Sequence, residues 1–438
     1  MQISFVDIFN LGVFIAFTIC YSYQLLYILE VLIRRHRDKK EAKTQHKFAV
    51  LIAARNEEKV IGNLLDSIEK QKYPKELVDV FVIADNCTDS TADIAREHGA
   101  FVVERYNTEQ IGKGYALDYG YHYIQEHHGD AGYEAYMVFD ADNVLDCHYI
   151  EAMNVTLDNG AAASTSYRNS KNFATNWISA GYGTWFIRES KFLSQARQDL
   201  NTSCAISGTG FFIRADVLDE KGGWPWHLLT EDIEFSIVSA IEERRIEYTP
   251  NAVLYDEQPT RFKDSWTQRE RWAKGFYQVF GKYAKDLIKG IFTSSKGKKF
   301  ACYDMLMTIA PGMLLTIITV IFNAVIVTMG LAGVMSTGMM VASSISSILF
   351  CVINYVAFMF VIGLITIFTE WDSFIATTPK KILYMFTFPM FMLTYIPIAI
   401  AALFRKPQWK PIEHLVDVKI DAIAPTKELN ASTKEIPA

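Results

Sequence analysis

Long apolar stretches near both ends of the chain limit its fold more than any other feature. Residues 8–29 contain no charged side chain and few strongly polar ones, such as Gln24, and residues 305–329, 339–368 and 382–404 are similarly apolar. Each stretch is long enough for a helix that crosses the bilayer core, which takes about 20 apolar residues. The sequence therefore predicts a multi-pass membrane protein whose charged residues are concentrated between the apolar flanks.

The amino-terminal stretch is predicted to be an uncleaved anchor. A signal peptide would need its basic residues first, yet the basic cluster at residues 34–40 follows the apolar stretch, and no small-residue cleavage site is present. Basic residues favour the cytoplasmic side. We therefore expect an outside amino end, a cytoplasmic central region and a location in a bacterial plasma membrane.

The side on which the carboxy-terminal tail lies is harder to predict. Three crossings from the cytoplasm would place the basic residues in 405–410 outside, against the positive-inside rule. The last apolar stretch contains Pro389 and Pro397 and could therefore be kinked or re-entrant. We expect an inside tail, with one stretch that does not simply cross.

Composition excludes several other classes of protein. Half of the residues are apolar and 21% are charged, which excludes a disordered chain, and the net charge of -6 gives no basic field for nucleic acid. The six cysteines are scattered and form no C-x-x-C pair. Reduced thiols in the cytosol fit this spacing better than a disulfide framework or a structural zinc site.

The central region alternates short apolar runs with helical stretches. Three runs are typical of buried strands, namely residues 48–54, 78–84 and 136–139. Two stretches are typical of helices, namely residues 57–70 and residues 91–98, the second opened by a capping box at Ser90. This order predicts an α/β fold of β-α-β units on a mostly parallel sheet.

We expect six segments along the chain. They are an anchor (1–33), a basic juxtamembrane linker (34–46), an α/β region (47–266), an interfacial helical region (267–300), later membrane helices (301–404) and a tail (405–438).

Charged side chains follow the predicted strands, at Arg55, Asp85 and the pair Asp140 and Asp142. Open α/β sheets bind ligands beyond the carboxyl ends of their strands. The Asp140-Ala141-Asp142 pair supplies hard oxygen ligands for Mg²⁺ or Mn²⁺, and such an ion can hold a diphosphate. Alone, an Asp-x-Asp is more often a turn or a helix cap, but its place at a strand end favours a site.

The sequence Thr230-Glu231-Asp232 precedes an apolar, helix-like run. In a purely structural interpretation, Thr230 caps this helix and the acids interact favourably with its dipole. In the functional interpretation, Asp232 is a general base.

Gln268, Arg271 and Trp272 are spaced i, i+3 and i+4, on one face of a predicted helix. This face offers an amide, a guanidinium fork suited to phosphate oxygens and an aromatic platform for a sugar ring. The alternative is an amphipathic helix lying on the membrane, because an apolar stripe with lysines around it continues to Leu287.

Two glycine-containing stretches are weaker candidates. The Gly-Lys-Gly at residues 112–114 could present Lys113 to phosphate, but it lacks the spacing of a P-loop. A second stretch is flexible enough for the backbone to approach a ligand closely: Ser207, Gly208, Thr209 and Gly210.

Taken in order, these motifs resemble the processive family 2 glycosyltransferases, which include cellulose, chitin, hyaluronan and poly-N-acetylglucosamine synthases. The family pattern of separated aspartates followed by Q-x-x-R-W is similar to Asp85, Asp140 with Asp142, Asp232, and residues 268–272. The similarity covers residues 47–283, between the membrane segments. It implies a GT-A fold and an inverting hexosyl transfer, such as that of N-acetylglucosamine, from a UDP-sugar to give a β-linkage.

The resemblance also implies roles for the matching residues. Uracil and ribose would lie among Ala53, Arg55, Glu57 and Asp85, with Lys113 near the donor. Asp142, with Asp140 and Ala141, would hold the diphosphate through Mg²⁺ or Mn²⁺, and Asp232 would deprotonate the acceptor hydroxyl. The acceptor and the departing UDP would be served by Glu231, Gln268, Arg271, Trp272, Ser207, Gly208, Thr209 and Gly210.

The chain departs from the family pattern in three respects. Neither the F-x-V-T-x-K gating segment of cellulose synthases nor the W-G-T-R element of hyaluronan synthases is present, and the 34 residues after Phe404 are too few for a cyclic-dinucleotide-binding domain. These differences leave open whether the product is a polymer.

Three functions remain open from the sequence. The first is synthesis of a β-linked polysaccharide, coupled to export and involving accessory or export subunits. The second is transfer of one sugar to a lipid acceptor. The third is a non-enzymatic nucleotide-binding transporter or receptor, and the small number of ionisable residues in the apolar stretches argues against it. All three involve the lipid bilayer, and none involves nucleic acid.

Overall fold

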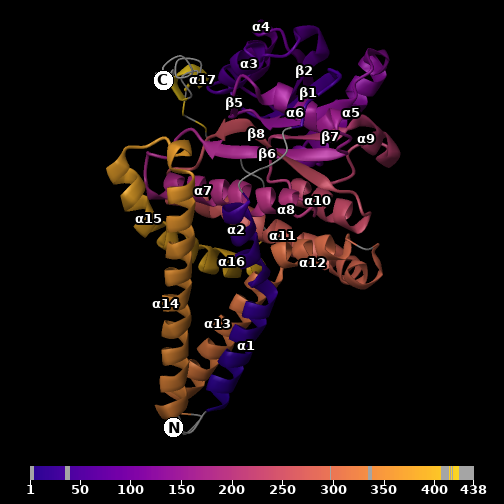
Figure 1. The fold of residues 1–438 in the computed structure, drawn as a ribbon. Coiled ribbons are helices and arrows are strands. Elements are labelled where there is room, and N and C mark those ends of the chain that lie inside the picture. Colours follow the sequence, from indigo (N-terminus) through magenta and orange to yellow (C-terminus); the bar gives the residue numbers. More distant parts are fainter. Residues whose placement is uncertain are drawn as a thin grey trace, which may run out of the picture.

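The computed structural model describes residues 4–34, 40–295, 297–333, 338–405, 414, 416 and 418–423. The chain forms an α/β body and a group of long helices that extend from it (Figure 1). Most of the two basic clusters noted in the sequence, residues 35–39 and 406–410, lies outside the described residues.

An eight-stranded mixed sheet lies at the centre of the body, in the order β3-β2-β1-β4-β7-β6-β8-β5. Its strands are β1 (Phe48–Ala54), β2 (Val78–Asp85), β3 (Phe101–Arg105), β4 (Ala135–Asp140), β5 (Val144–Leu145), β6 (Ala163–Ser170), β7 (Phe211–Arg214) and β8 (Ile246–Asp256). Strands β3, β2, β1 and β4 run parallel, β7 is antiparallel to both neighbours, and β6 is parallel to β8. The three strands expected from apolar runs are β1, β2 and β4, so the predicted mostly parallel α/β sheet is confirmed.

Helices cover both faces of the sheet, because successive side chains of a strand point to opposite faces. Val50 and Ile52 of β1 belong to a buried cluster with α3 and α6, whereas Leu51 belongs to a cluster with α5, α9 and α10. The helices of the body are α3 (Ile61–Glu69), α4 (Thr91–Glu97), α5 (Lys113–His128), α6 (Tyr149–Asp158), α7 (Trp177–Arg188), α8 (Gln195–Asp199), α9 (Ala215–Lys221), α10 (Glu231–Ile241) and α11 (Phe262–Thr293). Shorter turns are η1 (Lys75–Leu77), η2 (Gly129–Ala131), η4 (Trp371–Ser373) and the π-helical η3 (Glu189–Ser194).

Two local predictions are wrong in detail. α3 begins at Ile61 rather than Glu57, because the chain first makes a turn in which the Val60 N–H donates to the Glu57 carbonyl (3.0 Å). Ser90 forms no capping box at α4, since its backbone (φ −80°, ψ 11°) is not in the extended conformation that capping residues adopt. Asp89 takes this part, and its carboxylate accepts from the Thr91 N–H at 3.1 Å.

Four helical segments are long and apolar enough to cross a membrane: Phe5–Ile33, Lys299–Leu331, Val341–Thr369 and Thr378–Phe404. They consist of α1 (Phe5–Tyr21) with α2 (Tyr23–Ile33), α12 (Lys299–Ile309) with α13 (Pro311–Leu331), α14 (Gly338–Thr369), and α15 (Thr378–Leu393) with α16 (Tyr395–Phe404). Figure 1 shows α1, α13 and α14 extending away from the body, whereas α12, α15 and α16 stay beside it. Asn10 of α1 and Asn323 of α13 exchange two amide hydrogen bonds (3.1 and 2.8 Å), which satisfies these polar groups among apolar helices.

The last described residues pack on the α/β body. Lys419 Nζ lies 3.3 Å from Asp66 Oδ2, and Lys70 Nζ lies 2.5 Å from Asp421 Oδ2. In Figure 1 the short helix α17 (Ile420–Ile423) is accordingly near α3, far from the lower ends of α1, α13 and α14. The described residues of the tail thus lie at the body end of the long helices.

Candidate functional site

The sheet order brings the predicted aspartates to one edge. β1 lies between β2 and β4, with Ala53 beside Asp140 in the register, so Asp85 and Asp140 end the two strands that flank β1. Arg55 follows β1 directly. The parallel strands therefore collect, at their carboxyl ends, residues that are far apart in the sequence.

Asp142 is buried, with 6% of its surface exposed, and it is surrounded by positive groups and hydrogen-bond donors. The N–H of Glu257 donates to its Oδ2 at 3.0 Å, and His414 Nε2 lies 3.9 Å from the same oxygen. Burial alone would raise the pKa of Asp142, but His414, Lys171 and the Glu257 N–H together lower it. Asp142 is thus an ionised carboxylate at the strand end.

The residues around Asp142 fit a divalent ion that would take some of its ligands from the protein and the others from a bound phosphate group. Within the described residues, no group of three or more His, Cys, Asp or Glu side chains is arranged to hold a metal ion. Asp142 and Asp140 offer carboxylate oxygens of the kind that Mg²⁺ and Mn²⁺ prefer, and Mg²⁺ commonly takes its remaining ligands from phosphate and water.

The two acids expected near the nucleoside already have partners in the structure. Asp85 forms a buried ion pair in which Arg105 Nη1 lies 2.5 Å from Oδ1. Glu57 accepts a hydrogen bond of 2.9 Å from His414 Nδ1. Burial would lower the pKa of His414, but Asp142 and Glu57 raise it to about 10, so this histidine is a cation that links the two predicted parts of the donor site.

Lys113 is the first residue of α5 and connects the two halves of the site. Its Nζ donates to Asp140 Oδ1 and, at 2.8 Å, to the carbonyl of Gly208. Burial would lower the pKa of Lys113, but Asp140 and Glu231 raise it. Gly114 is needed for close packing, since a Cβ there would lie 2.2 Å from the Trp226 carbonyl oxygen. The Gly-Lys-Gly stretch therefore places a cation between carboxylates.

Asp232 lies in the first turn of α10, facing the same space. Its Oδ2 accepts from the Gly208 N–H at 2.6 Å, and burial raises its pKa. Burial and the neighbouring Asp232 also raise the pKa of Glu231, to about 8. Thr230 makes no side-chain capping bond, and its buried Oγ1 has no partner among the described residues. The interpretation of Thr230 as a helix cap is therefore wrong, and Asp232 has the environment of a proton acceptor.

The segment from Ser207 to Gly210 lies between the two groups of carboxylates. Thr209 Oγ1 accepts from the Asp140 N–H at 2.9 Å, while Gly208, at φ +79°, bonds Asp232 and Lys113. Gly210 is required by packing, because a Cβ would lie 1.8 Å from Leu254 Cδ2. The backbone of Gly208 thus contacts site residues of this chain.

Gln268, Arg271 and Trp272 project from α11 near these acids. Arg271 lies close enough to Glu231, Asp140 and Asp232 for their charges to raise its pKa, although burial is the larger effect and leaves it lowered. Arg271 Nε and Gln268 Oε1 are buried with no hydrogen-bond partner among the described residues. Unpaired buried polar atoms are costly, so both are suited to a polar ligand.

Trp272 packs against an aromatic pair of the body. Its ring centroid lies 5.9 Å from that of Tyr182 and 6.2 Å from that of Phe186, edge to face in both cases. Further along α11, Val279 and Leu287 are fully buried in a cluster with α10 and α12. The prediction that this stripe lies on a membrane surface is therefore wrong for these two residues, which pack inside the protein.

Sequence analysis missed four residues of this region: Arg168, Lys171, Asp256 and His414. Asp256 ends β8, and a search for acids after strands would have found it if β8 had been predicted. Arg168 lies in β6, whose Ser-Thr-Ser-Tyr-Arg run lacks the apolar pattern of a strand. His414 lies in the tail, and no sequence signal connects it to Glu57 or Asp142.

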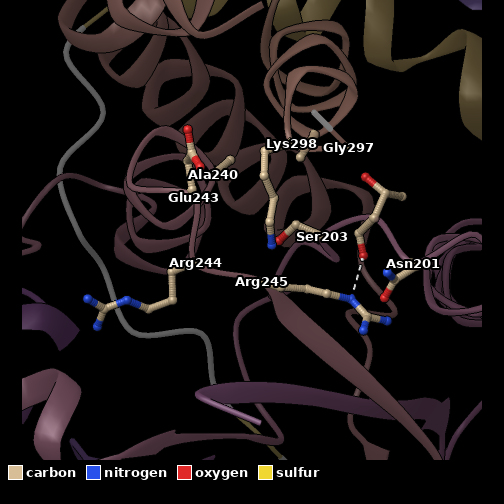
Figure 2. Close-up of a pocket in the computed structure, with 10 residues that line it drawn as sticks. Asn201, Ser203, Ala240, Glu243, Arg244, Arg245, Gly297 and Lys298 are labelled. Carbon is tan, nitrogen blue, oxygen red and sulfur yellow. Dashed lines mark hydrogen bonds between the residues drawn. The ribbon is translucent and has the colours of Figure 1, made fainter. Parts of the chain in front are cut away.

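A second cavity lies at the opposite end of α10 and is not part of this site. Figure 2 shows its lining, in which Lys298 points toward Ser203 while Arg244 and Arg245 extend in opposite directions. Two of these cations are already paired, Arg244 with Glu220 (2.9 Å) and Arg245 with the Thr202 carbonyl (3.1 Å). The cavity is separated from Asp232 by the length of the helix.

Residues 46–275, just over half of the chain, match the family described as "Glycosyltransferase like family 2". The chain belongs to this family. The family 2 glycosyltransferase is 29% identical to the probable glycosyltransferase YdaM of Bacillus subtilis over 265 residues, which are 56% of this chain and 58% of YdaM. It is 28% identical to the beta-monoglucosyldiacylglycerol synthase of Nostoc over 271 residues (59% and 54%), and 28% identical to the poly-beta-1,6-N-acetyl-D-glucosamine synthase of Staphylococcus aureus over 266 residues (58% and 59%). The matches thus span little more than half the length of these curated relatives.

A solved structure resembles the family 2 glycosyltransferase over most of its length. It is the mannosyltransferase PcManGT of Pyrobaculum calidifontis in complex with GDP-Man and Mn²⁺, with a TM-score of 0.56 and 18% identity. The similarity covers 90% of this chain and 97% of that one. At this identity the comparison concerns the fold alone, and it confirms the GT-A fold expected from the sequence.

Proposed function

We propose that this family 2 glycosyltransferase transfers a hexosyl group from a UDP-sugar to a hydroxyl of a growing β-linked polysaccharide, with inversion at the anomeric carbon. One observation carries the proposal. At the carboxyl ends of the strands, Lys113 is paired with Asp140 and lies near Asp232, and the pKa of Asp142 is lowered whereas that of Asp232 is raised. A diphosphate and an attacking hydroxyl need these two different environments.

In the donor half, Ala53, Arg55, Glu57 and Asp85 would surround the nucleoside. Asp142 and Asp140 would hold Mg²⁺ or Mn²⁺, and a bound ion would offset the negative charge that develops on the departing diphosphate. His414 lies 3.9 Å from Asp142 and 2.9 Å from Glu57, so it borders both the base-binding and the diphosphate-binding parts.

In the acceptor half, Asp232 removes the proton from the acceptor hydroxyl as its oxygen bonds to the anomeric carbon. The bond from that carbon to the diphosphate oxygen breaks, and UDP leaves with the electron pair. Arg271 and Lys113 lie beside the carboxylates as fixed cations that stabilise the leaving group. Trp272 and Gln268 are assigned to the acceptor, with Gln268 Oε1 free to accept a sugar hydroxyl.

A lipid acceptor is the second candidate, and the position of α11 favours it. This helix carries Arg271 and Trp272 and is bonded to α16 by Tyr277, whose hydroxyl donates to the Ala399 carbonyl at 2.9 Å, and by Lys274, whose Nζ donates to the Ala402 carbonyl at 3.2 Å. The acceptor half therefore adjoins helices that lead to the membrane segments. Of the relatives, one is named for polymer synthesis and one for glycolipid synthesis.

The proposed location is a bacterial plasma membrane, with the body in the cytoplasm, where nucleotide sugars are made. Four candidate membrane segments and the tail on the body side support this arrangement. Export of the product and accessory subunits belong to the proposal for a polymer.

The test is a donor screen with the purified full-length chain in lipid nanodiscs. UDP-Glc, UDP-GlcNAc, UDP-GlcA, UDP-Gal and GDP-Man are compared for nucleotide release with Mg²⁺ or Mn²⁺, and product length is measured with radiolabelled sugar. We expect metal-dependent UDP release with one UDP-sugar and a ladder of β-linked products. A product with a single sugar on a lipid would support the second candidate, the lipid acceptor, instead of the polymer. No nucleotide release from any donor would instead favour a non-enzymatic nucleotide-binding protein.

A further inference from the structure

Arg168 of β6 lies under the Ser207–Gly210 segment, and the proposed reaction assigns it no role. Its Nε donates to Asp256 Oδ2 at 2.8 Å, its Nη2 donates to the same oxygen, and its Nη1 donates to the Ser207 carbonyl at 2.7 Å. The guanidinium also lies 3.7 Å from the centroid of the Phe186 ring. All three nitrogens therefore have partners within the protein, and the group is bound in place rather than left for a substrate.

The segment that Arg168 holds is bonded to both groups of carboxylates. The Gly208 N–H donates to Asp232 Oδ2 at 2.6 Å, and Thr209 Oγ1 accepts from the Asp140 N–H at 2.9 Å. A shift of the Ser207 carbonyl would consequently displace the donor that orients Asp232. A misplacement of about 1 Å can reduce an enzymatic rate by about 100-fold.

On the side of Arg168, hydrogen bonds hold Ser207 of this segment. A polar cavity of about 10 Å³, room for about one water, lies beneath it, and Arg168, Glu189, Ser207 and Thr209 are among its lining residues. Glu189 begins the π-helical η3, and its Oε2 accepts from Ser207 Oγ at 3.3 Å. On this side hydrogen bonds therefore hold Ser207, and Arg168 supplies the shortest of them.

We propose that Arg168, anchored by Asp256, is a positioning residue that holds the Ser207–Thr209 segment so that the Gly208 N–H orients Asp232 for proton removal. This inference rests on the proposed function of Asp232. A buried arginine–carboxylate pair gains little stability, because desolvation offsets the attraction, but it fixes a geometry when all its donors are bonded. Asp256 is 3% exposed, and Nε, Nη1 and Nη2 of Arg168 all have partners, so this pair is both buried and fully bonded.

The decisive variant is Arg168→Lys in the full-length chain. Lysine keeps the positive charge beside Asp256, but it cannot bond Asp256 and the Ser207 carbonyl with a planar fork. We expect kcat to fall about 100-fold while the KM for the donor stays within about threefold. The acid limb of the pH profile of kcat should also move up by about one pH unit, because Asp232 loses an N–H bond that favours its ionised form.

The matched control is Arg214→Lys. Arg214 also forms a two-pronged pair with an aspartate, at 2.6 and 2.7 Å from Asp216, but it lies at the exposed end of β7. The Arg214→Lys substitution should leave kcat and the pH profile of kcat unchanged. If Arg168→Lys fails to fold, Asp256→Asn replaces it, since the amide keeps the shape but weakens the anchor, and the same two changes are expected.

The outcomes separate this inference from the proposed function. Absence of transfer in the wild type and in Arg214→Lys, with every donor, would refute the proposed function itself. An active wild type with a kcat within threefold in Arg168→Lys or, where that variant does not fold, in Asp256→Asn would overturn the inference alone. A reduced kcat with an unmoved acid limb would also overturn it, because a merely structural defect lowers the rate without changing the titration of Asp232.

Discussion

Asp142 and Asp232 belong to one site, yet the structure shifts their pKa values in opposite directions. The pKa of Asp142 is lowered although the residue is buried, and the pKa of Asp232 is raised. Asp142 lies beside His414, Lys171 and the Glu257 N–H, whereas Asp232 lies beside Glu231, itself with a raised pKa of about 8. The comparison teaches that residue type alone does not assign a role, because neighbouring charges lower the pKa of one aspartate whereas burial raises the pKa of the other.

The largest expected effect is that of Asp232→Asn. The asparagine can still accept from the Gly208 N–H, so the site should keep its shape while losing the base. General-base catalysis contributes between about 100- and 10,000-fold, so we expect transfer to fall about 1,000-fold while UDP affinity stays within about threefold. Initial rates and UDP titrations on the same preparation measure both quantities.

Thermal unfolding provides the control for Asp232→Asn. Loss of a purely structural helix-end interaction would cost about 1 kcal/mol of stability and leave the rate per folded molecule nearly unchanged. Retention of transfer within a few fold of wild type would therefore show that Asp232 is not the base.

Asp142→Asn is expected to have the next largest effect. The variant removes the charge that would bind a divalent ion in the proposed donor half, and loss of such electrostatic stabilisation typically lowers the rate by about 100-fold or more. The apparent affinity for Mn²⁺, from activity titrations and from direct binding in the presence of UDP, should weaken in parallel. Asp130→Asn, at an exposed position, is the matched control. Full activity of Asp142→Asn in EDTA would contradict a metal role.

The sequence predicted the donor edge well and its surroundings poorly, for physical reasons. β1, β2 and β4 are continuous apolar runs because parallel strands are covered on both faces, so the acids after β2 and β4 could be located. The partners that distinguish Asp142 from Asp232 come from elsewhere. His414 reaches the site from the tail, and Arg168 lies in a hydroxyl-rich strand. Such contacts depend on tertiary folding and leave no local periodicity.

Residue type alone also gave wrong predictions of helix caps, because the backbone conformation determines whether a side chain can cap a helix. Ser90 and Thr230 have the residue types of helix caps, but neither makes a capping bond, because the backbone at each position departs from the capping conformation. The stripe of α11 has the pattern of a membrane-surface helix, yet Val279 and Leu287 are buried by α10 and α12. An amphipathic pattern indicates that one face is covered, not what covers it.

Trp272→Ala is expected to change the ratio of two reactions rather than abolish either. If Trp272 stacks on the acceptor, transfer to sugar should fall about tenfold relative to hydrolysis of the donor by water, the effect of losing about 1.4 kcal/mol of aromatic contact. Trp266→Ala is the control, because Trp266 lies on the same helix and donates to Glu270 (2.9 Å) outside the site. An unchanged ratio of transfer to hydrolysis would remove Trp272 from the acceptor site.

The smallest expected effect is on stability, and it tests whether the carboxylates in the two halves of the site have different electrostatic environments. Glu231 has a pKa of about 8 in the folded protein, above its usual 4.5, so the folded state retains a proton that the unfolded state releases. Stability should therefore fall as the pH rises from about 5 to about 8. Glu231→Gln, which stays neutral, should lack this loss, so its Tm should exceed that of wild type at pH 8 but not at pH 5. Asp142→Asn should instead be less stable than wild type at neutral pH, and this difference should shrink as the pH falls. The reason is that the lowered pKa of Asp142 contributes stability that is lost only as the pH falls through that pKa. Parallel Tm–pH profiles for the two variants would show that both carboxylates have similar environments, against the division of roles.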